Sequence, residues 1–229
     1  MNVLIIIPAF NEAESIRNVL SDLQEYFPEG NPVIINDGST DDTSAIAKSL
    51  NVRVVDLPYN LGIGGAVQTG FIIAENEGCD AAVQLDGDGQ HMAEEIRKLR
   101  ASFNEEVDIV VGSRFLGTKE YQMPFFRKLG ARLFSFVISS VCGSKITDTT
   151  SGFRIYGKRA IKFFSSDYPE DYPEVEALIL AHKKRLRIKE VPVRMRRRLG
   201  GKSSITLLEA VYYMIKVLLA VFVDLLKKY

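Results

Sequence analysis

Two aspartates separated by a single glycine stand at the end of an apolar segment. Residues 83–91 read VQLDGDGQH, so Asp86 and Asp88 follow a run that is typical of a buried strand. Residues two apart on an extended backbone point to the same side, which lets both carboxylates face one point. Two like charges held this close need a counter-ion, and hard divalent cations such as Mg²⁺ or Mn²⁺ prefer oxygen ligands. The spacing therefore predicts a metal site at Asp86 and Asp88, with Gln90 as a further ligand.

Other interpretations of the same letters can be compared with this one. A calcium-binding EF-hand loop starting at Asp86 needs Gly at its sixth position and Glu at its twelfth, where this chain has His91 and Arg97. That interpretation is therefore excluded. An aspartyl phosphotransferase would use Asp86 as a nucleophile, and Ser113 at the end of another apolar run resembles such a site. A plain turn is the third alternative.

The first half of the chain alternates short apolar runs with amphipathic segments. The pattern predicts strands at 3–7, 33–35, 52–55, 81–85 and 107–111, and helices at 11–27, 41–50, 64–77 and 91–103. Continuous apolar strands between helices are typical of a parallel sheet covered on both faces, which is the doubly wound α/β architecture. In such sheets ligands bind beyond the carboxyl ends of the strands.

Polar residues gather at four of these expected strand ends, at 8–12, 36–39, 86–88 and 112–114. Each group alone suits a turn or a helix cap, but together they predict one ligand crevice. A glycine-rich stretch at 62–65 does not satisfy the dinucleotide-binding pattern and does not follow the first strand. We expect Gly64 there to let the backbone approach a ligand, or simply to start a helix.

Composition describes a globular protein with a local excess of positive charge. The chain has 229 residues, 46% of them hydrophobic, and a formal net charge of zero. Its two cysteines, Cys79 and Cys142, lack metal-ligand spacing and are expected to be buried thiols. Between residues 183 and 202 there are ten Lys or Arg and one acid, Glu190. Such a run marks a solvated face, or a site for phosphate groups or an anionic membrane surface, whereas no nucleic-acid motif accompanies it.

Two apolar segments indicate contact with a membrane or a partner. Residues 205–226 are nearly continuously apolar but contain Glu209, Lys216 and Asp224, which fall on one helical stripe. We expect an amphipathic helix at 205–229 that lies in the membrane interface or in a subunit contact, following a catalytic domain at 1–204. Residues 123–141 mix apolar and basic side chains in a similar way. The N-terminus lacks the features of a signal peptide, which favours a cytoplasmic location.

An ordered series of short motifs resembles the family 2 glycosyltransferases, which have a GT-A fold. Within that family the chain is similar to the dolichyl- or polyprenyl-phosphate sugar transferases, over roughly residues 2–204. Each motif alone is weak, whereas the ordered set is specific. The series is PAFNE at 8–12, NDGSTD at 36–41, NLG at 60–62, DGDGQH at 86–91, GSR at 112–114 and TSGFR at 150–154.

The resemblance implies roles for individual residues. It places the nucleotide sugar on Asp37, Gly64, Asp86, Gly87 and Asp88, and on the first motif, which comprises Pro8, Ala9, Phe10, Asn11 and Glu12. Arg198 and Lys202 would close on the pyrophosphate, and Arg114, Arg127 and Arg154 would lie near an acceptor phosphate. Two departures are Phe10, where Tyr is common, and Met92-Ala93 after His91, where Pro-Pro is usual.

The resemblance also implies an activity. It predicts a metal-dependent inverting transfer of a sugar from a nucleotide sugar to polyprenyl phosphate, such as undecaprenyl phosphate, for cell-envelope glycan synthesis. A UDP-sugar, such as UDP-glucose or UDP-GlcNAc, is favoured over GDP-mannose. The enzyme is expected to be peripheral on the inner face of the cell membrane, with a second copy of the chain or a membrane accessory protein as a further partner.

Two other functions stay open. A transferase acting on a saccharide hydroxyl would need a carboxylate base, for which Asp148, Glu174 and Glu176 are candidates. A non-catalytic nucleotide-binding module would bind the nucleotide sugar without turnover.

Overall fold

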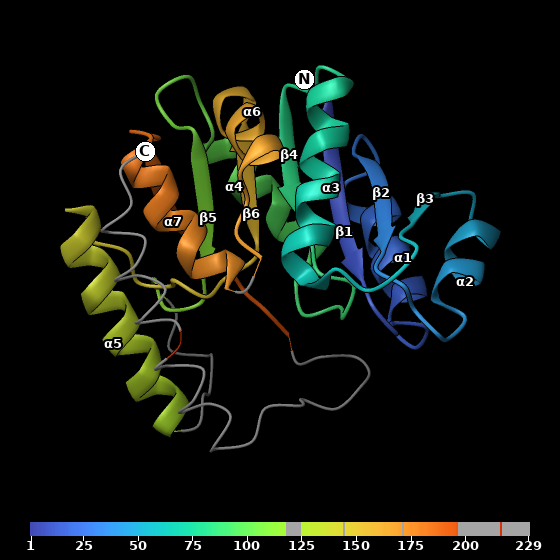
Figure 1. Ribbon diagram of the computed structural model, residues 1–229, viewed down its shortest axis with the longest axis horizontal. Helices are drawn as coiled ribbons and strands as arrows, with labels where there is room; N and C mark the ends of the chain where they lie inside the picture. Colours follow the sequence, from blue (N-terminus) through green and yellow to red (C-terminus); the bar gives the residue numbers. More distant parts are fainter. Residues whose placement is uncertain (118–124, 144, 171, 197–215, 217–229) are drawn as a thin grey trace.

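A seven-stranded sheet with helices on both faces forms the protein (Figure 1). The computed structural model describes residues 1–117, 125–143, 145–170, 172–196 and 216. The strands are β1 (Val3–Ala9), β2 (Asn31–Asn36), β3 (Arg53–Asp56), β4 (Ala81–Gln84), β5 (Ile109–Ser113), β6 (Arg154–Gly157) and β7 (Ile188–Pro192). The helices are α1 (Ile16–Tyr26), α2 (Thr43–Ser49), α3 (Gly62–Asn76), the 3₁₀ turn η1 (Ala93–Glu95), α4 (Ile96–Ser102), α5 (Phe125–Cys142), α6 (Lys158–Ser166) and α7 (Pro173–Lys183). The expected C-terminal helix at 205–229 lies outside the described residues, apart from Lys216.

The strand order is β3-β2-β1-β4-β6-β5-β7. Every neighbouring pair is parallel except those made by β6, which runs antiparallel to both β4 and β5. The structure therefore confirms a mostly parallel α/β sheet. It corrects the expectation that the ends of β4 and β5 lie side by side, because β6 separates them.

Strand periodicity divides the core into two layers. On β1, Leu4 and Ile6 pack with α3, α5, α6 and α7 on one face, whereas Val3, Ile5 and Ile7 pack with α1, α2 and α4 on the other. Alternate side chains of a strand point to opposite faces, so a strand covered on both sides must be apolar throughout. All seven residues of β1 are accordingly buried.

Helix α3 lies unusually close to β1, and its N-terminus reaches the carboxyl end of the sheet. A Cβ atom at Gly70 would lie 2.3 Å from Cγ2 of Ile6 and 2.8 Å from its Cγ1. Only a residue without a side chain permits this approach. The close packing of α3 against β1 sets the position of the residues at its first turn.

We expect Gly70→Ala to destabilise the protein by about 1 to 3 kcal/mol, because an added methyl group overpacks the contact with Ile6. Thermal and denaturant unfolding would measure the loss. In an Ile6→Ala background the same substitution should cost much less, since the clashing atoms are gone. An equal cost in both backgrounds would contradict this contact.

Candidate active site

A cavity of about 520 Å³ opens at the carboxyl ends of β1, β2 and β4. This volume lies within the range of about 300 to 1,000 Å³ that is usual for small-ligand pockets. Most of the residues expected to bind the nucleotide sugar line it, namely Pro8, Ala9, Phe10, Asn11, Glu12, Asp37, Asp86, Gly87 and Asp88. The structure thus brings three of the four polar strand ends together.

The lining also includes Asn60, Gly62, Ile63 and Ala66, from the turn after β3 and the first turn of α3. Asn60 and Gly62 belong to a motif noted in the sequence. Ile63 and Ala66 were missed, because apolar residues at a helix start give no signal of ligand contact.

The two aspartates after β4 flank a glycine that packs against the end of β1. The Gly87 N–H donates to the carbonyl of Pro8 at 3.3 Å, and a Cβ atom on Gly87 would lie 3.1 Å from that oxygen. Asp88 is 8% exposed, whereas the side chain of Asp86 is 32% exposed. Both residues line the cavity.

The chemistry of these two carboxylates fits a divalent cation. Their hard oxygen atoms match Mg²⁺ or Mn²⁺, which are commonly completed by water and substrate phosphates. Among the described residues no group of three or more His, Cys, Asp or Glu side chains is placed to hold a metal ion. The expected third ligand, Gln90, donates its backbone N–H to Oδ1 of Asp88 at 2.9 Å, and it does not line the cavity. Its role as a ligand stays a prediction.

Beyond the ends of β1 and β2, the side chains of Asn11 and Asp37 bind neighbouring loops that border the cavity. Oδ1 of Asp37 accepts the backbone N–H of Leu61 at 2.7 Å. Asn11 has a φ of 56°, in the left-handed region, and its side-chain oxygen accepts the N–H of Thr40 at 2.8 Å. Phe10 is 46% exposed, which leaves its ring open for contact with a planar group.

Gly64 lies in the first turn of α3 and packs against a neighbouring loop. A Cβ atom at this position would lie 2.3 Å from the carbonyl oxygen of Pro169 and 2.7 Å from Cα of Glu170. The glycine lets α3 pass this loop of the same chain. Its expected contact with the nucleotide sugar stays a prediction.

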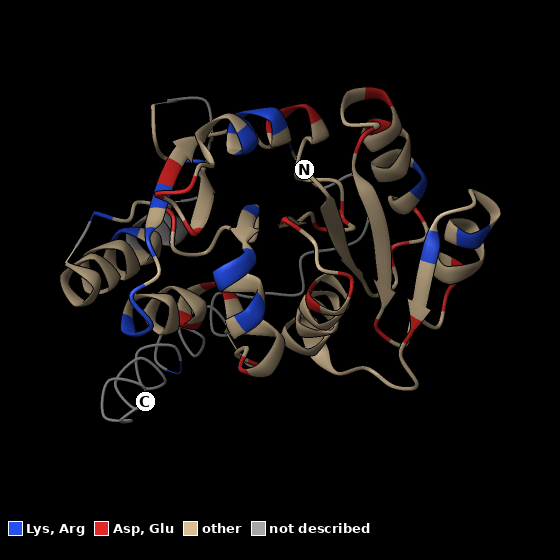
Figure 2. Ribbon diagram, turned by 90° about the horizontal axis from the view of Figure 1, so that it is seen from above, with Lys and Arg blue, Asp and Glu red and all other residues tan. Residues whose placement is uncertain are grey.

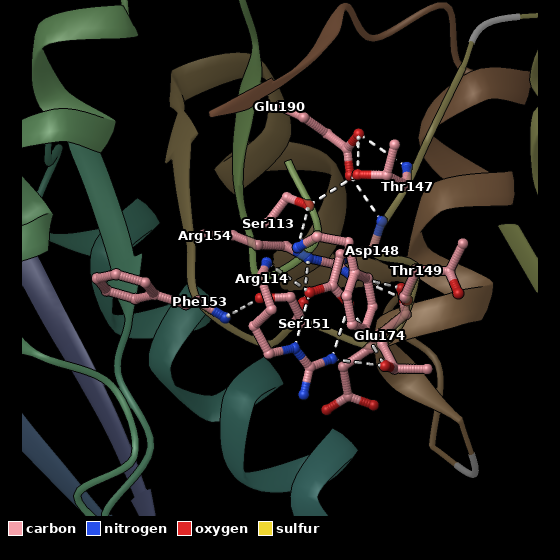
Figure 3. Close-up of polar contacts among 12 residues, drawn as sticks. Ser113, Arg114, Thr147, Asp148, Thr149, Ser151, Phe153, Arg154, Glu174 and Glu190 are labelled. Atoms are coloured by element: carbon pink, nitrogen blue, oxygen red, sulfur yellow. Dashed lines mark hydrogen bonds and ion pairs between the residues drawn. The ribbon is translucent and has the colours of Figure 1, made fainter. Parts of the chain in front are cut away.

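A second polar cluster lies around the loop 147–151, beside the end of β5 (Figure 3). Arg114 donates from Nε and Nη2 to the two carboxylate oxygens of Asp148, each at 2.7 Å. Asp148 is fully buried, and its N–H donates to Glu190 on β7 at 2.8 Å. The Arg114 guanidinium thus neutralises a buried carboxylate of its own chain, and it does not line the cavity described above.

Arg154 is likewise engaged inside the protein. It is 1% exposed, and its guanidinium donates to the carbonyl of Ser151 at 2.8 Å and to that of Glu174 at 2.7 Å. These contacts join β6 to the start of α7. The expected place of Arg154 near an acceptor phosphate stays a prediction. The side chain of Arg127, and all of Arg198 and Lys202, lie outside the described part of the chain.

Glu174 is the carboxyl group of α7 that interacts with the site. Burial raises its pKa, and the negative charge of Asp86 raises it further. Helix α7 begins at Pro173 and has Glu174 and Glu176 in its first turn. Proline and acidic residues are both common there, because proline needs no N–H partner and the helix N-terminus carries a partial positive charge. Burial also raises the pKa of the neighbouring Tyr168 hydroxyl well above its usual value, so this hydroxyl stays protonated at neutral pH.

Several residues of the basic run form ion pairs within the chain. Arg187 pairs with Asp108, Arg194 with Glu94 and Glu95, and Arg196 with Asp22. In Figure 2, acidic and basic residues alternate around the outline of the described molecule. These three arginines therefore act first as structural partners.

Comparison with known proteins agrees with this architecture. The model of the glycosyl transferase family 2 matches residues 4–164. A UDP-N-acetylglucosamine–dolichyl-phosphate N-acetylglucosaminyltransferase of Methanococcus voltae is 37% identical over 84% of each chain. An undecaprenyl-phosphate mannosyltransferase of Micrococcus luteus is 30% identical over 90% of this chain and 88% of its own length.

A solved structure has the same fold. Glucosyl-3-phosphoglycerate synthase from Mycobacterium tuberculosis, crystallised with Mn²⁺, UDP and glucosyl-3-phosphoglycerate, superposes with a TM-score of 0.75. It is 20% identical, and the match covers 97% of this chain and 79% of the synthase chain. The expected GT-A fold is confirmed. With a family model that matches residues 4–164 and close relatives that match along most of their length, the chain belongs to glycosyl transferase family 2.

Proposed function

We propose that this family 2 glycosyltransferase moves a sugar from a nucleotide sugar to polyprenyl phosphate, with a divalent cation held by Asp86 and Asp88. One observation carries the proposal: Asp37, Phe10 and the two aspartates line one cavity, and β1 separates β2, which precedes Asp37, from β4, which precedes the aspartates. This arrangement fits a nucleoside diphosphate, whose base and ribose would lie near Asp37 and whose diphosphate would lie near the two aspartates. The names of the two relatives above, which refer to dolichyl and undecaprenyl phosphate, support the acceptor.

A UDP-sugar is the favoured donor, with UDP-GlcNAc and UDP-glucose ahead of GDP-mannose. The relative from Methanococcus voltae is named for UDP-N-acetylglucosamine, and the similar structure contains UDP. In this chain Phe10 would stack on the base, and Asp37 would accept its ring N–H. Asn11 would act indirectly, because its side-chain oxygen already joins the two loops beside the base.

The chemical difficulty of the transfer is the charge on the leaving group. An oxygen of the acceptor phosphate attacks the anomeric carbon, the bond from that carbon to the diphosphate breaks, and the nucleoside diphosphate leaves with the electron pair. A cation bound by Asp86 and Asp88 would act as a Lewis acid that neutralises this charge. The proposed contribution of Arg198 and Lys202 is further positive charge beside the pyrophosphate.

A phosphate acceptor removes the need for a general base. The second pKa of a phosphate monoester is about 6, so its oxygen is already anionic at neutral pH. In agreement with this, Asp148, one candidate base, has both carboxylate oxygens bound to Arg114 and no exposed surface. A hydroxyl acceptor would have to rely on Glu174 or Glu176.

Helix α5 supports a peripheral location at the membrane surface. Two of its apolar side chains point into solvent, with Leu133 43% and Phe136 72% exposed, and they lie on the segment that the sequence indicates for lipid contact. Among the described residues no helix is long and apolar enough to cross a bilayer. We place the enzyme on the cytoplasmic face, where a second copy of the chain or an accessory protein would assist binding.

The direct test is transfer of label to lipid. Purified protein with Mn²⁺ or Mg²⁺, undecaprenyl phosphate and a panel of labelled UDP- and GDP-sugars should move label into the organic phase with one donor. Asp88→Ala should lower this rate by a hundredfold or more, on the order of 2.7 to 4 kcal/mol of transition-state stabilisation, and leave the unfolding temperature unchanged. If no donor labels the lipid, or if Asp88→Ala turns over normally, the proposal is wrong.

The acceptor class can be tested separately at α7. Glu174→Gln removes the carboxylate that feels the charge of Asp86 but keeps the size of the side chain. Glu176→Gln, two residues further along α7, is the matched variant. With a phosphate acceptor we expect both variants to keep most of their activity, since no proton is abstracted. A loss of about 10² to 10⁴-fold in kcat for one variant alone would instead identify a general base and a hydroxyl acceptor.

A further inference from the structure

Three groups hold the loop that presents Asp86 and Asp88, and two of them come from distant parts of the chain. The first is Ser15, at the N-cap position of α1. A serine there normally caps its own helix, but the Ser15 hydroxyl makes no such bond. It is fully buried, and its Oγ lies 2.7 Å from the carbonyl oxygen of Gly87, between the two aspartates, and 2.8 Å from Oε2 of Glu12. The hydroxyl thus joins the loop to Glu12, which also lines the cavity.

The second group is Arg196, which follows β7. Its Nε donates to the carbonyl of Gly89 at 2.7 Å, and its backbone N–H donates to the carbonyl of Gln90 at 3.0 Å. The same guanidinium pairs with Asp22 of α1, which anchors it on the side away from the loop. One arginine therefore holds two successive carbonyls.

The third group is His91, at the end of the loop itself. Its Nδ1 accepts the backbone N–H of Asp86 at 3.0 Å, and its Nε2 lies 3.5 Å from Oδ2 of the same residue. The ring is 5% exposed and stacks on Phe153, with 4.9 Å between ring centroids. The backbone N–H of Asp86, at the start of the loop, thus donates to a ring that packing holds in place.

Together these contacts leave little freedom to the backbone that carries the two carboxylates. Two like charges repel each other and would turn apart on a flexible loop when no cation lies between them. Groups that orient metal ligands in this way raise the affinity for the metal ion, and their loss typically lowers that affinity about 10- to 100-fold.

We propose that Ser15 and Arg196, with His91, are positioning residues that hold Asp86 and Asp88 ready for a divalent cation and a diphosphate. This inference rests on the proposed function, because it requires these aspartates to bind the cation. It adds residues that do not line the cavity. Ser15 and Arg196 act through the carbonyls of Gly87, Gly89 and Gln90, and His91 acts through the N–H of Asp86.

The test measures Mn²⁺ binding directly, without turnover. Electron paramagnetic resonance and titration calorimetry would give the Mn²⁺ affinity in the presence of UDP for the wild type, Ser15→Ala and Arg196→Lys. We expect each variant to bind Mn²⁺ about 10- to 100-fold more weakly. Because the Ser15 hydroxyl makes no cap bond, Ser15→Ala should remain folded. If it does not, Arg196→Lys tests the same loop while keeping the positive charge.

Matched controls separate positioning from general stability. Ser166→Ala removes a hydroxyl that donates to a backbone carbonyl at the end of α6, and Arg100→Lys alters an exposed ion pair with Glu29. Both controls should bind Mn²⁺ as the wild type does. If Ser15→Ala and Arg196→Lys are folded and also bind like the wild type, the positioning inference is overturned. If the wild type itself binds no better than Asp88→Ala, the proposed cation site fails as well.

Discussion

The repulsion between two neighbouring carboxylates is the constraint on which the site depends. Asp86 and Asp88 lie at the end of a fully buried strand, separated by a glycine that packs against β1. A fold can hold such a pair only if the backbone around it is supported and if a positive charge is supplied when the protein works. The contacts with Pro8, Ser15, His91 and Arg196 provide the support. In our account the positive charge comes from a cation that arrives with the diphosphate.

Some arginines of the chain stabilise the fold, and others are predicted to bind the substrates. Arg114 and Arg154 look like phosphate-binding residues, but one neutralises a buried aspartate and the other satisfies backbone carbonyls. Breaking a buried pair such as Arg114–Asp148 by removing one partner costs about 3 to 5 kcal/mol, so this arginine is committed to the fold. In the proposed reaction Arg127 would meet the acceptor phosphate, and its role stays a prediction, as do those of Arg114 and Arg154.

The first half of the fold and the cavity were predictable because their signals are local. The apolar run of β1 and the polar residues that follow it predict both a buried strand and a ligand at its end. The insertion of β6 was not predictable in this way, since Arg154-Ile155-Tyr156-Gly157 is short and starts with a charge. Without β6, the end of β5 was expected beside β4. The place of Arg154 near the acceptor was inferred from the resemblance, which gives no signal of its burial.

The supporting contacts of the aspartate loop were not predictable from spacing. Ser15 lies 72 residues from Gly87 in the sequence, and its position at a helix start indicates an ordinary cap. Arg196 lies 107 residues from Gly89, within a basic run that suggests a surface. Such roles depend on which segments the sheet topology brings together, and only the three-dimensional arrangement contains that information.

The measurement that tests the central claim most directly is the linkage between cation and nucleotide. The affinity of the wild-type protein for UDP would be titrated with and without Mn²⁺, and the affinity for Mn²⁺ with and without UDP. The account predicts that each ligand strengthens binding of the other by the same factor, because the cation joins the two aspartates to the diphosphate. Equal UDP affinity in the presence and absence of Mn²⁺ would contradict the account.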